Sequence, residues 1–395
     1  MRYLVALVMS LSLASCSIIS STPVLNQVLA SKGDTRPFDT PLPVNTAHKK
    51  LAIGYSTTVG VKADGTVWSW GSDYDGSLGN GRKPTQQPIP TPITGMTDFI
   101  EVAGTSSHFL ALRKDGSVWA WGDNRYGQLG YATVKNYSAV PQQVVGLKDI
   151  VSVATGYEFS LALDKQGTVY MSGVSKLWKI NVDKPYEQLN NLGFRAITQH
   201  EKAVKIITNT AHVILMKANG ELVACCDSTV KEFPKNVVDI AMASVATYFL
   251  LSNGLVFAEG QNRGGGYLGQ GDFTSHTGLV QVKNIGKVKS ITANSGSGVA
   301  LDEKGRIWQW GANVRYPLIA GVQSNYEPLP VLIKTFANAL TVQSGSANSV
   351  LLDDGHVYFW GREIGGGRGT GKVRGHEQLS SKDWSVPEKS LWTWK

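Results

Sequence analysis

Short apolar runs alternate with polar turn residues through most of the chain. In one unit the run from Phe109 to Leu112 precedes Asp115-Gly116, and the run from Val118 to Trp121 follows it. Both runs are rich in strand-forming residues, and Asp-Gly accepts the positive φ of a tight hairpin turn at little cost. The pattern predicts a β-hairpin around Gly116, and no stretch of the chain has a convincing amphipathic helical period.

This hairpin recurs at a spacing of about fifty residues. The turn glycines of the successive units are Gly65, Gly116, Gly167, Gly220, Gly254, Gly305 and Gly355. The step from Gly220 to Gly254 is the short one, because that unit lacks the long loop of the others. Runs such as Asp149 to Val153, together with a Pro-led apolar stretch after each loop, bring each unit to four strands.

Seven such units predict an all-β fold, a seven-bladed β-propeller with four-stranded blades and a truncated fourth repeat. A lone four-stranded sheet cannot bury both of its faces, but sheets arranged radially cover one another. Tryptophans recur at one phase of the repeat, at Trp70, Trp121, Trp310 and Trp360. We expect them to pack between blades rather than to form a sugar-binding ladder. We expect the C-terminal Trp392-Thr393-Trp394 to close the ring or to pack on it.

The first residues have the features of an export signal. Arg2 is followed by an apolar run that is too short to span a bilayer, and then by Leu13-Ala14-Ser15-Cys16. We expect residues 1–15 to be a lipoprotein signal peptide, residues 16–49 an acylated N-terminus with a flexible tether, and residues 50–395 the propeller. An ordinary signal peptide that contains a cysteine is the alternative. Ser17 after the acylated (palmitate-bearing) Cys16 resembles the sorting signal for the outer membrane of Gram-negative bacteria.

The cysteine positions and the charge distribution argue against a disulfide and against nucleic-acid binding. Cys225 and Cys226 are adjacent, so on a strand they point to opposite faces, and we expect them to be packing residues rather than a disulfide. The formal net charge of +8 is spread along the chain. It allows acidic partners, but without a basic stripe we expect no nucleic-acid binding.

The repeat resembles that of the regulator of chromosome condensation family, over roughly residues 50 to 390. That family has a turn glycine, an aromatic-Gly pair and a Gly-x-Leu-Gly loop. Here Asp123 to Gly130 matches the loop closely, Ser72 to Gly79 matches it less well, and Gln261 to Gly269 matches it with one insertion. The kelch repeat has a similar period, but its double glycine is absent. Histidines often precede the family's turn glycine, as His108 and His212 do here, and we expect these two to bond within their own blades.

No motif in the chain makes a positive case for catalysis or for a cofactor. Gly366 to Lys372 nearly spells a phosphate-binding loop, but Val373 stands where Ser or Thr must hold magnesium. Asp73-Tyr74-Asp75-Gly76 is a fragment of a calcium loop without its later acidic ligand, so a loop-stabilising role is favoured. The histidines form no metal-binding cluster, and no nucleophile elbow occurs. We therefore expect no enzyme activity, no cofactor and no metal.

Loops on a rigid scaffold are the usual place for binding residues, and Tyr and Arg are enriched at interface hot spots. The candidate binding residues of equivalent loops are Asp73, Tyr74, Asn124, Arg125, Tyr126, Arg263, Arg362 and Arg368.

The expected function is that of a monomeric, non-enzymatic scaffold or inhibitor that binds a protein in the bacterial envelope. A secreted bacterial member of the resembled family inhibits β-lactamases with loops from one end of its disc, and an unrelated propeller lipoprotein scaffolds the assembly of outer-membrane barrels. A polysaccharide-binding protein or hydrolase of the envelope is the first alternative. Nucleotide exchange on a small GTPase, the activity of the founding member, is disfavoured by the export signal.

Overall fold

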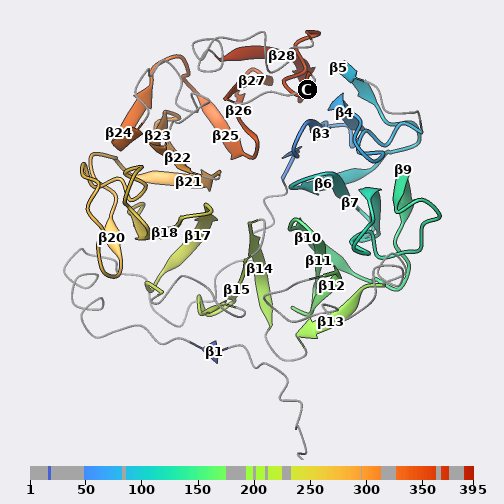
Figure 1. Cartoon of the computed structure of the whole chain (residues 1–395), viewed down its shortest axis with the longest axis horizontal. Coiled ribbons are helices and arrows are strands. Elements are labelled where there is room, and N and C mark those ends of the chain that lie inside the picture. The colour runs from blue at the N-terminus through green and yellow to red at the C-terminus, as the bar shows by residue number, and fades with distance from the viewer. Residues whose placement is uncertain are drawn as a thin grey trace, which may run out of the picture.

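The structure is a computed structural model, and it confirms the seven-bladed propeller. Seven four-stranded antiparallel sheets stand in a ring, with β6, β10, β14, β17, β21 and β25 around the centre (Figure 1). The residues that it describes are 17–18, 49–81, 86–174, 193–198, 202–209, 212–224, 233–294, 296–312, 326–361, 366–372 and 387–395. Within these residues every regular element is a strand, and no helix is long and apolar enough to cross a membrane.

Each blade begins at the centre and adds its strands outward. Blade one contains β2 (Leu51–Ile53), β3 (Thr57–Val61), β4 (Val67–Ser72) and β5 (Gln86–Pro92). Blade two contains β6 (Phe99–Gly104), β7 (His108–Arg113), β8 (Val118–Asp123) and β9 (Tyr137–Gln143). Blade three contains β10 (Ile150–Thr155), β11 (Phe159–Asp164), β12 (Val169–Gly173) and β13 (Arg195–Thr198).

The other blades follow the same order, except for the outermost strand of blade four. Blade four contains β14 (Ala203–Thr208), β15 (Val213–Lys217), β16 (Leu222–Ala224) and, at its outer edge, β1 (Ser17–Ile18). Blade five contains β17 (Val237–Met242), β18 (Ala246–Leu251), β19 (Val256–Gly260) and β20 (Val280–Gln281). Blade six contains β21 (Val288–Ala293), β22 (Ser297–Asp302), β23 (Ile307–Ala312) and β24 (Tyr326–Ile333). Blade seven contains β25 (Ala339–Ser344), β26 (Ala347–Leu352), β27 (His356–Gly361) and β28 (Glu388–Thr393).

The strand pairing shows which turns and loops lie at each of the two ends of the ring. His108 at the start of β7 pairs with Gly122 at the end of β8, and the amide of Asp123 donates to the carbonyl of Ser107 at 3.0 Å. The turn between the first and second strands therefore lies beside the loop after the third strand. We call this the loop end, and we call the opposite end, where the Asp-Gly hairpins lie, the turn end.

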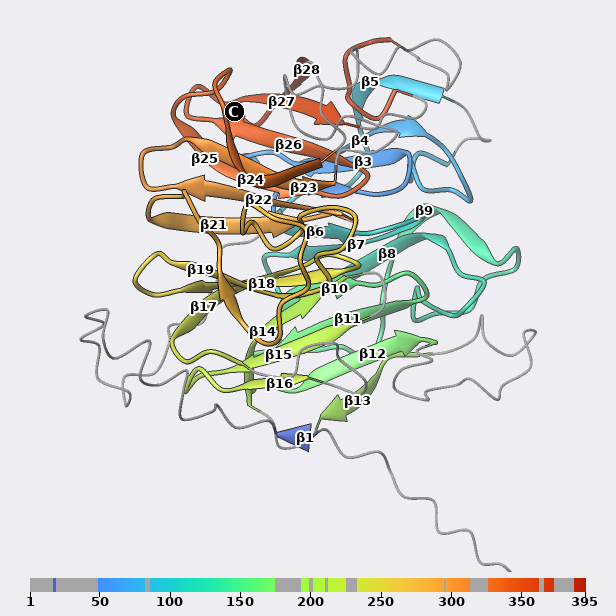
Figure 2. The same ribbon diagram turned by 60° about the vertical axis from the view of Figure 1, so that its left-hand side comes forward.

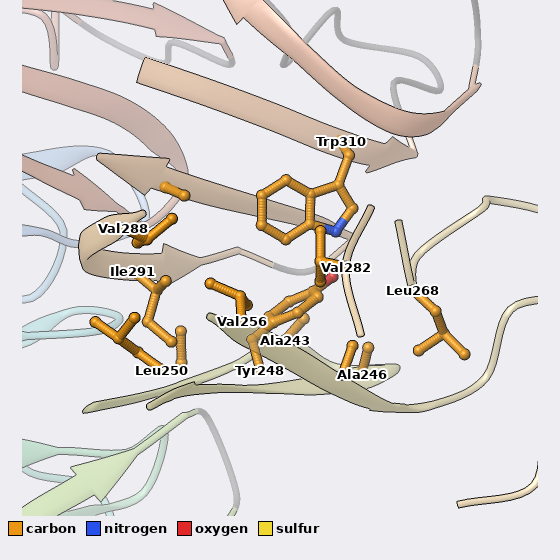
Figure 3. Close-up of a cluster of buried hydrophobic side chains, with 13 residues drawn as sticks. Ala243, Ala246, Tyr248, Leu250, Val256, Leu268, Val282, Val288, Ile291 and Trp310 are labelled. Atoms are coloured by element: carbon orange, nitrogen blue, oxygen red, sulfur yellow. The ribbon is translucent and has the colours of Figure 1, made fainter. Parts of the chain in front are cut away.

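The core lies between neighbouring blades. Trp70, Trp121, Trp310 and Trp360 are fully buried, as expected from their phase in the repeat. Figure 3 shows one such layer, in which Tyr248 of blade five and Trp310 of blade six meet edge to face with ring centroids 5.3 Å apart. Burial of aromatic side chains of this size contributes about 2–3 kcal/mol each, so these layers hold the blades together.

In the four blades whose third strand ends in a buried tryptophan, the indole N–H joins that blade to the one before it. Trp121 donates to the Ser77 carbonyl at 2.9 Å, and Trp310 donates to the Tyr267 carbonyl at 3.1 Å. Both acceptors lie in the loop after the third strand of the preceding blade. In blade three Ser172 takes the place of the tryptophan, and its hydroxyl donates to the Gly127 carbonyl at 2.6 Å. Blade three therefore keeps a hydrogen bond to the preceding blade although it lacks the aromatic residue.

The ring closes by the same rule, without a blade shared between the two ends of the chain. Trp70 of blade one donates to the Gly367 carbonyl of blade seven at 2.9 Å. Its ring also packs on Trp392, which is almost fully buried, with centroids 5.6 Å apart. The amide of Ala63 donates to the Trp394 carbonyl at 3.0 Å. Packing of the C-terminal tryptophan segment against blade one therefore closes the ring.

Candidate binding surface at the loop end

The long loops after the third strands of blades one, two and five are each held from inside by a polar side chain. The backbone amide of Leu129 donates to Asn124 Oδ1 at 2.9 Å, and Leu78 donates in the same way to Asp73 Oδ1 at 2.9 Å. Asn262 accepts the equivalent bond from Leu268 at 3.0 Å. The leucines insert into the core with no exposed surface.

Asp73 and Asn124 must therefore be removed from the candidate binding residues. Asp73 is 4% exposed and Asn124 is fully buried, because both side chains are used to shape their loops. Burial raises the pKa of the Asp73 carboxyl, against the bond from Leu78 that lowers it. The loop-stabilising role expected for the Asp73 to Gly76 segment is confirmed.

Arg125 lies at the surface and joins the loops of blades one and two. Its Nε and Nη2 atoms contact the two oxygens of Asp123 at 2.9 and 3.0 Å. Nη2 also lies 2.9 Å from Asp75 Oδ2 in the loop of blade one. About half of the Arg125 side chain stays exposed, so the guanidinium is held in one orientation while one side of it faces solvent.

Three tyrosines are exposed on the same end of the ring as this arginine. Tyr74 is 52% exposed and directly precedes Asp75, the partner of Arg125. Tyr55 and Tyr157 are 48% and 56% exposed and lie in the turns between the first and second strands of blades one and three. The amide of Tyr55 donates to the Ser106 carbonyl of blade two at 3.1 Å, and Thr105 Oγ1 of blade two donates to the Thr155 carbonyl of blade three at 2.8 Å, so these turns follow one another around the ring. Together with Arg125, the three tyrosines form what we call the tyrosine arc, over blades one to three.

The sequence analysis missed Tyr55 and Tyr157. Each follows a glycine, Gly54 and Gly156, at the same position of its repeat. In the second unit the corresponding pair is Thr105-Ser106. An aromatic residue at a turn position that is otherwise small and polar was the signal that could have identified them.

The remaining candidates divide between surface and core. Arg263 is exposed and Tyr126 is half-buried, and both lie in loops at the loop end. Arg368 is fully buried, contacts Glu388 at 3.0 Å and donates to the Gly361 carbonyl. It therefore links its loop to β27 and β28 within blade seven and must be removed from the candidate binding residues. Arg362, Cys16 and the Cys225-Cys226 pair lie outside the described residues.

His108 does not bond within its own blade, contrary to the expectation from the sequence. Its Nε2 atom lies 3.0 Å from Ser160 Oγ in blade three, so it bonds to the neighbouring blade rather than within its own. Burial lowers its pKa to about 4, and the nearby Asp123 carboxylate opposes that effect. No cluster of three or more His, Cys, Asp or Glu side chains suited to a metal ion occurs in the described part of the chain.

Charged side chains from several blades meet in the central channel. Lys205 of β14 forms an ion pair with Asp239 of β17, and Glu101 of β6 accepts a hydrogen bond from Ser152 of β10 at 3.1 Å. Lys49 lies within range of the charges of Glu101, Lys205 and Asp239. The surrounding protein lowers the pKa of Lys49 by desolvation. The channel is therefore lined with charges that are engaged with one another, which favours a structural role for them.

The glycine-rich segment that resembles a phosphate-binding loop also has a structural role. The Gly367 carbonyl accepts hydrogen bonds from Trp70 and from Thr58 Oγ1, at 2.9 and 2.8 Å. The amide of Gly371 donates to the Pro88 carbonyl of blade one at 3.1 Å. This segment occupies the loop position of blade seven and links that blade to blade one.

Comparison with known proteins identifies the same repeat that the sequence pattern indicates. Residues 64–112 and 115–163 match the model of the regulator of chromosome condensation (RCC1) repeat, and residues 49–77 and 99–128 match a second model of the same repeat. The chain is 32% identical over 155 residues to the human E3 ubiquitin-protein ligase HERC2, across 36% of this chain and 3% of HERC2. It is 24% identical over 350 residues to protein pim1 of Schizosaccharomyces pombe, across 79% of this chain and 58% of pim1.

A solved structure has the same fold. The chain superimposes on Prp20p of Saccharomyces cerevisiae with a TM-score of 0.63 and 22% identity, over 75% of this chain and 80% of Prp20p. The matches to HERC2 and pim1 span less than two thirds of those proteins, so the likeness concerns the propeller and not their whole architecture. Residues 49–163 therefore carry repeats of the RCC1 type, and the chain folds as a seven-bladed β-propeller.

Proposed function

We propose that this protein is a non-enzymatic binding propeller that recognises a protein partner with its tyrosine arc, and that a lipid on Cys16 holds it at the bacterial envelope. The observation that carries the binding proposal is the exposure of Tyr55, Tyr74 and Tyr157 on the same end of the ring as Arg125. Tyr and Arg are the residue types that dominate interface hot spots, because they bury large areas and still donate hydrogen bonds.

Preorganisation supports the same proposal. The loops of the tyrosine arc are held by Asn124, Asp73 and the Trp121 indole, all of which are buried. A surface that is rigid before binding loses little conformational entropy when a partner docks. Family relatives offer precedents, since the Prp20p structure is described with its binding to Gsp1p and histones.

The charges of the tyrosine arc indicate what kind of partner fits. Asp75 and Asp123 neutralise Arg125, so this part of the surface presents no net positive charge. A partner that offers apolar groups and hydrogen-bond acceptors to the tyrosines fits better than a strongly acidic one.

The envelope location is proposed from the sequence around Cys16. The short apolar run and the Leu13-Ala14-Ser15-Cys16 segment favour acylation of that cysteine after export. Ser17 in the following position favours the outer membrane.

The test is an affinity pull-down from crosslinked envelopes, with the mature lipoprotein tagged after Lys395. We expect one stoichiometric protein partner that is lost when Tyr74 and Tyr157 are both changed to Ala. The matched control is Val145→Ala, because Val145 is 78% exposed and lies in the connection after β9, at the turn end. A Cys16→Ser variant should release the protein from the membrane fraction without loss of partner binding to the purified protein.

An envelope polysaccharide is the second candidate ligand, and the same tyrosines favour it, since exposed aromatic rings also stack on sugars. A glycan array separates the two candidates. Binding of a glycan that depends on Tyr55 and Tyr157, with no enriched protein in the pull-down, would replace the protein-partner proposal.

A further inference from the structure

Blade four obtains its outermost strand in a different way from the other blades. The other six take β5, β9, β13, β20, β24 and β28 from their own repeats. In blade four the sheet order is β1-β16-β15-β14, and Ser17–Ile18 of β1 lies outermost. β1 lies at the rim of the ring, beyond β15 in Figure 1 and beyond β16 in Figure 2.

The truncated fourth repeat explains why this edge needs a strand from elsewhere. Residues 225–236 alone separate β16 from β17, whereas residues 124–149 separate β8 from β10 and include β9. The fourth repeat is thus too short for the loop and outer strand that the second repeat contains. Without another strand, the outer backbone groups of β16 would form an open sheet edge, which favours pairing with any extended segment.

We propose that the outer edge of β16 is a strand-acceptor site, and that the segment directly after Cys16 is its occupant. The pairing is antiparallel, with Ser17 opposite Ala224 and Ile18 opposite Val223. Backbone hydrogen bonds supply the recognition, as in other cases of strand addition to a sheet edge. The occupant is part of the same chain, so the effective concentration is high and two residue pairs are enough for partial docking.

The consequence concerns orientation at the membrane, and it rests on the proposed lipid at Cys16. A docked Ser17 fixes the acylated residue at the rim of blade four. The ring then stands on its rim at the membrane, with the loop end facing sideways. The tyrosine arc over blades one to three stays accessible to a partner in the envelope.

Hydrogen exchange tests the strand docking without any lipid. The samples are mature, non-lipidated protein with Cys16→Ser, alone and combined with Ser17→Pro and Ile18→Pro. Proline removes the amide hydrogens that β1 donates to β16, so the strand should undock. The outward-facing amide in residues 222–224 then loses its acceptor and should exchange about tenfold faster. The matched control combines Ser17→Ala and Ile18→Ala, which keeps both amide groups and should leave exchange unchanged. Equal exchange in all three proteins would overturn the docking.

A second measurement tests the orientation. The lipidated protein is bound to vesicles of phosphatidylethanolamine and phosphatidylglycerol with a paramagnetic headgroup, and a nitroxide is attached through an unnatural amino acid at position 219, 64 or 354. Asn219, Asp64 and Asp354 occupy the same exposed turn position in blades four, one and seven. We expect the strongest relaxation at position 219, and equal relaxation at all three would contradict the upright ring. If Cys16→Ser leaves vesicle binding intact, the lipid proposal fails, while the exchange result still decides the docking.

Discussion

His108 is buried between blades two and three, with its Nε2 atom 3.0 Å from Ser160 Oγ. Desolvation lowers its pKa to about 4, below the value of about 6.5 for an exposed histidine. Between these two pH values the unfolded chain binds a proton that the folded chain rejects. The contribution of His108 to stability is therefore complete above pH 6.5 and is lost as the pH falls toward 4.

The test is the His108→Gln variant, since glutamine stays neutral and can still bond to Ser160. Between pH 7 and pH 4 the free energy of unfolding should fall for both proteins. We expect the fall to be larger for the natural protein than for the variant, by on the order of 3 kcal/mol. Urea unfolding at several pH values measures this difference. Parallel pH profiles for the two proteins would mean that His108 titrates normally in the fold.

Gly122 occupies a position of the repeat where only glycine fits. Its φ is +94°, and a Cβ there would lie 2.2 Å from the Ser107 carbonyl oxygen. The third strand of blade two thus ends where only glycine lets the backbone approach the preceding turn. This contact explains the aromatic-Gly pair of the repeat: the aromatic side chain fills the space between blades, and the glycine brings the following loop to the loop end.

At the scale of the element, the bond from the third-strand tryptophan to the preceding loop organises both strand and loop. We expect Trp70→Phe to lower the free energy of unfolding by about 1–3 kcal/mol, because the Gly367 carbonyl loses the indole donor and a gap is left between blades seven and one. Trp68→Phe is the matched control. Trp68 donates to Thr66 Oγ1 at the turn end, has the Lys62 ammonium over its ring and is partly exposed, so its replacement by Phe should cost less than that of Trp70. Similar losses in chemical denaturation would contradict the bonding rule between blades.

The strands and hairpins could be predicted from the sequence because their signals are local. Asp115-Gly116 between two apolar runs specifies a turn and two strands without reference to the rest of the chain. The phase of Trp121 specifies burial for the same reason. Contacts between blades could not be read this way, since His108 and Ser160 are distant in sequence and meet only through the radial packing of blades.

The loop residues were harder to assign, because polar side chains in loops serve two purposes. Asp73, Asn124 and Arg368 share the composition of binding residues, yet they are buried and shape the loops or join strands. Tyr74 and Arg125 stand next to them in sequence and point to solvent. Only the direction of each side chain separates the two groups, and that direction depends on the folded loop.

At the scale of the whole molecule, the ring combines a regular scaffold with two irregular places. Blades one to three contain the family-matched repeats and carry the exposed tyrosines at the loop end. Blade four is truncated and carries β1 at its rim. We propose that blades one to three bind the partner and that blade four sets the orientation at the membrane.

Photocrosslinking in living cells tests the binding of a protein by the tyrosine arc most directly. A photoreactive amino acid is placed at position 55, 74 or 157 of the arc, or at position 145 or 391 as controls exposed elsewhere on the ring. We predict one common protein adduct from the three arc positions and none from the two controls. An adduct of equal yield from positions 145 and 391, or no protein adduct from any arc position, would contradict the proposed binding surface.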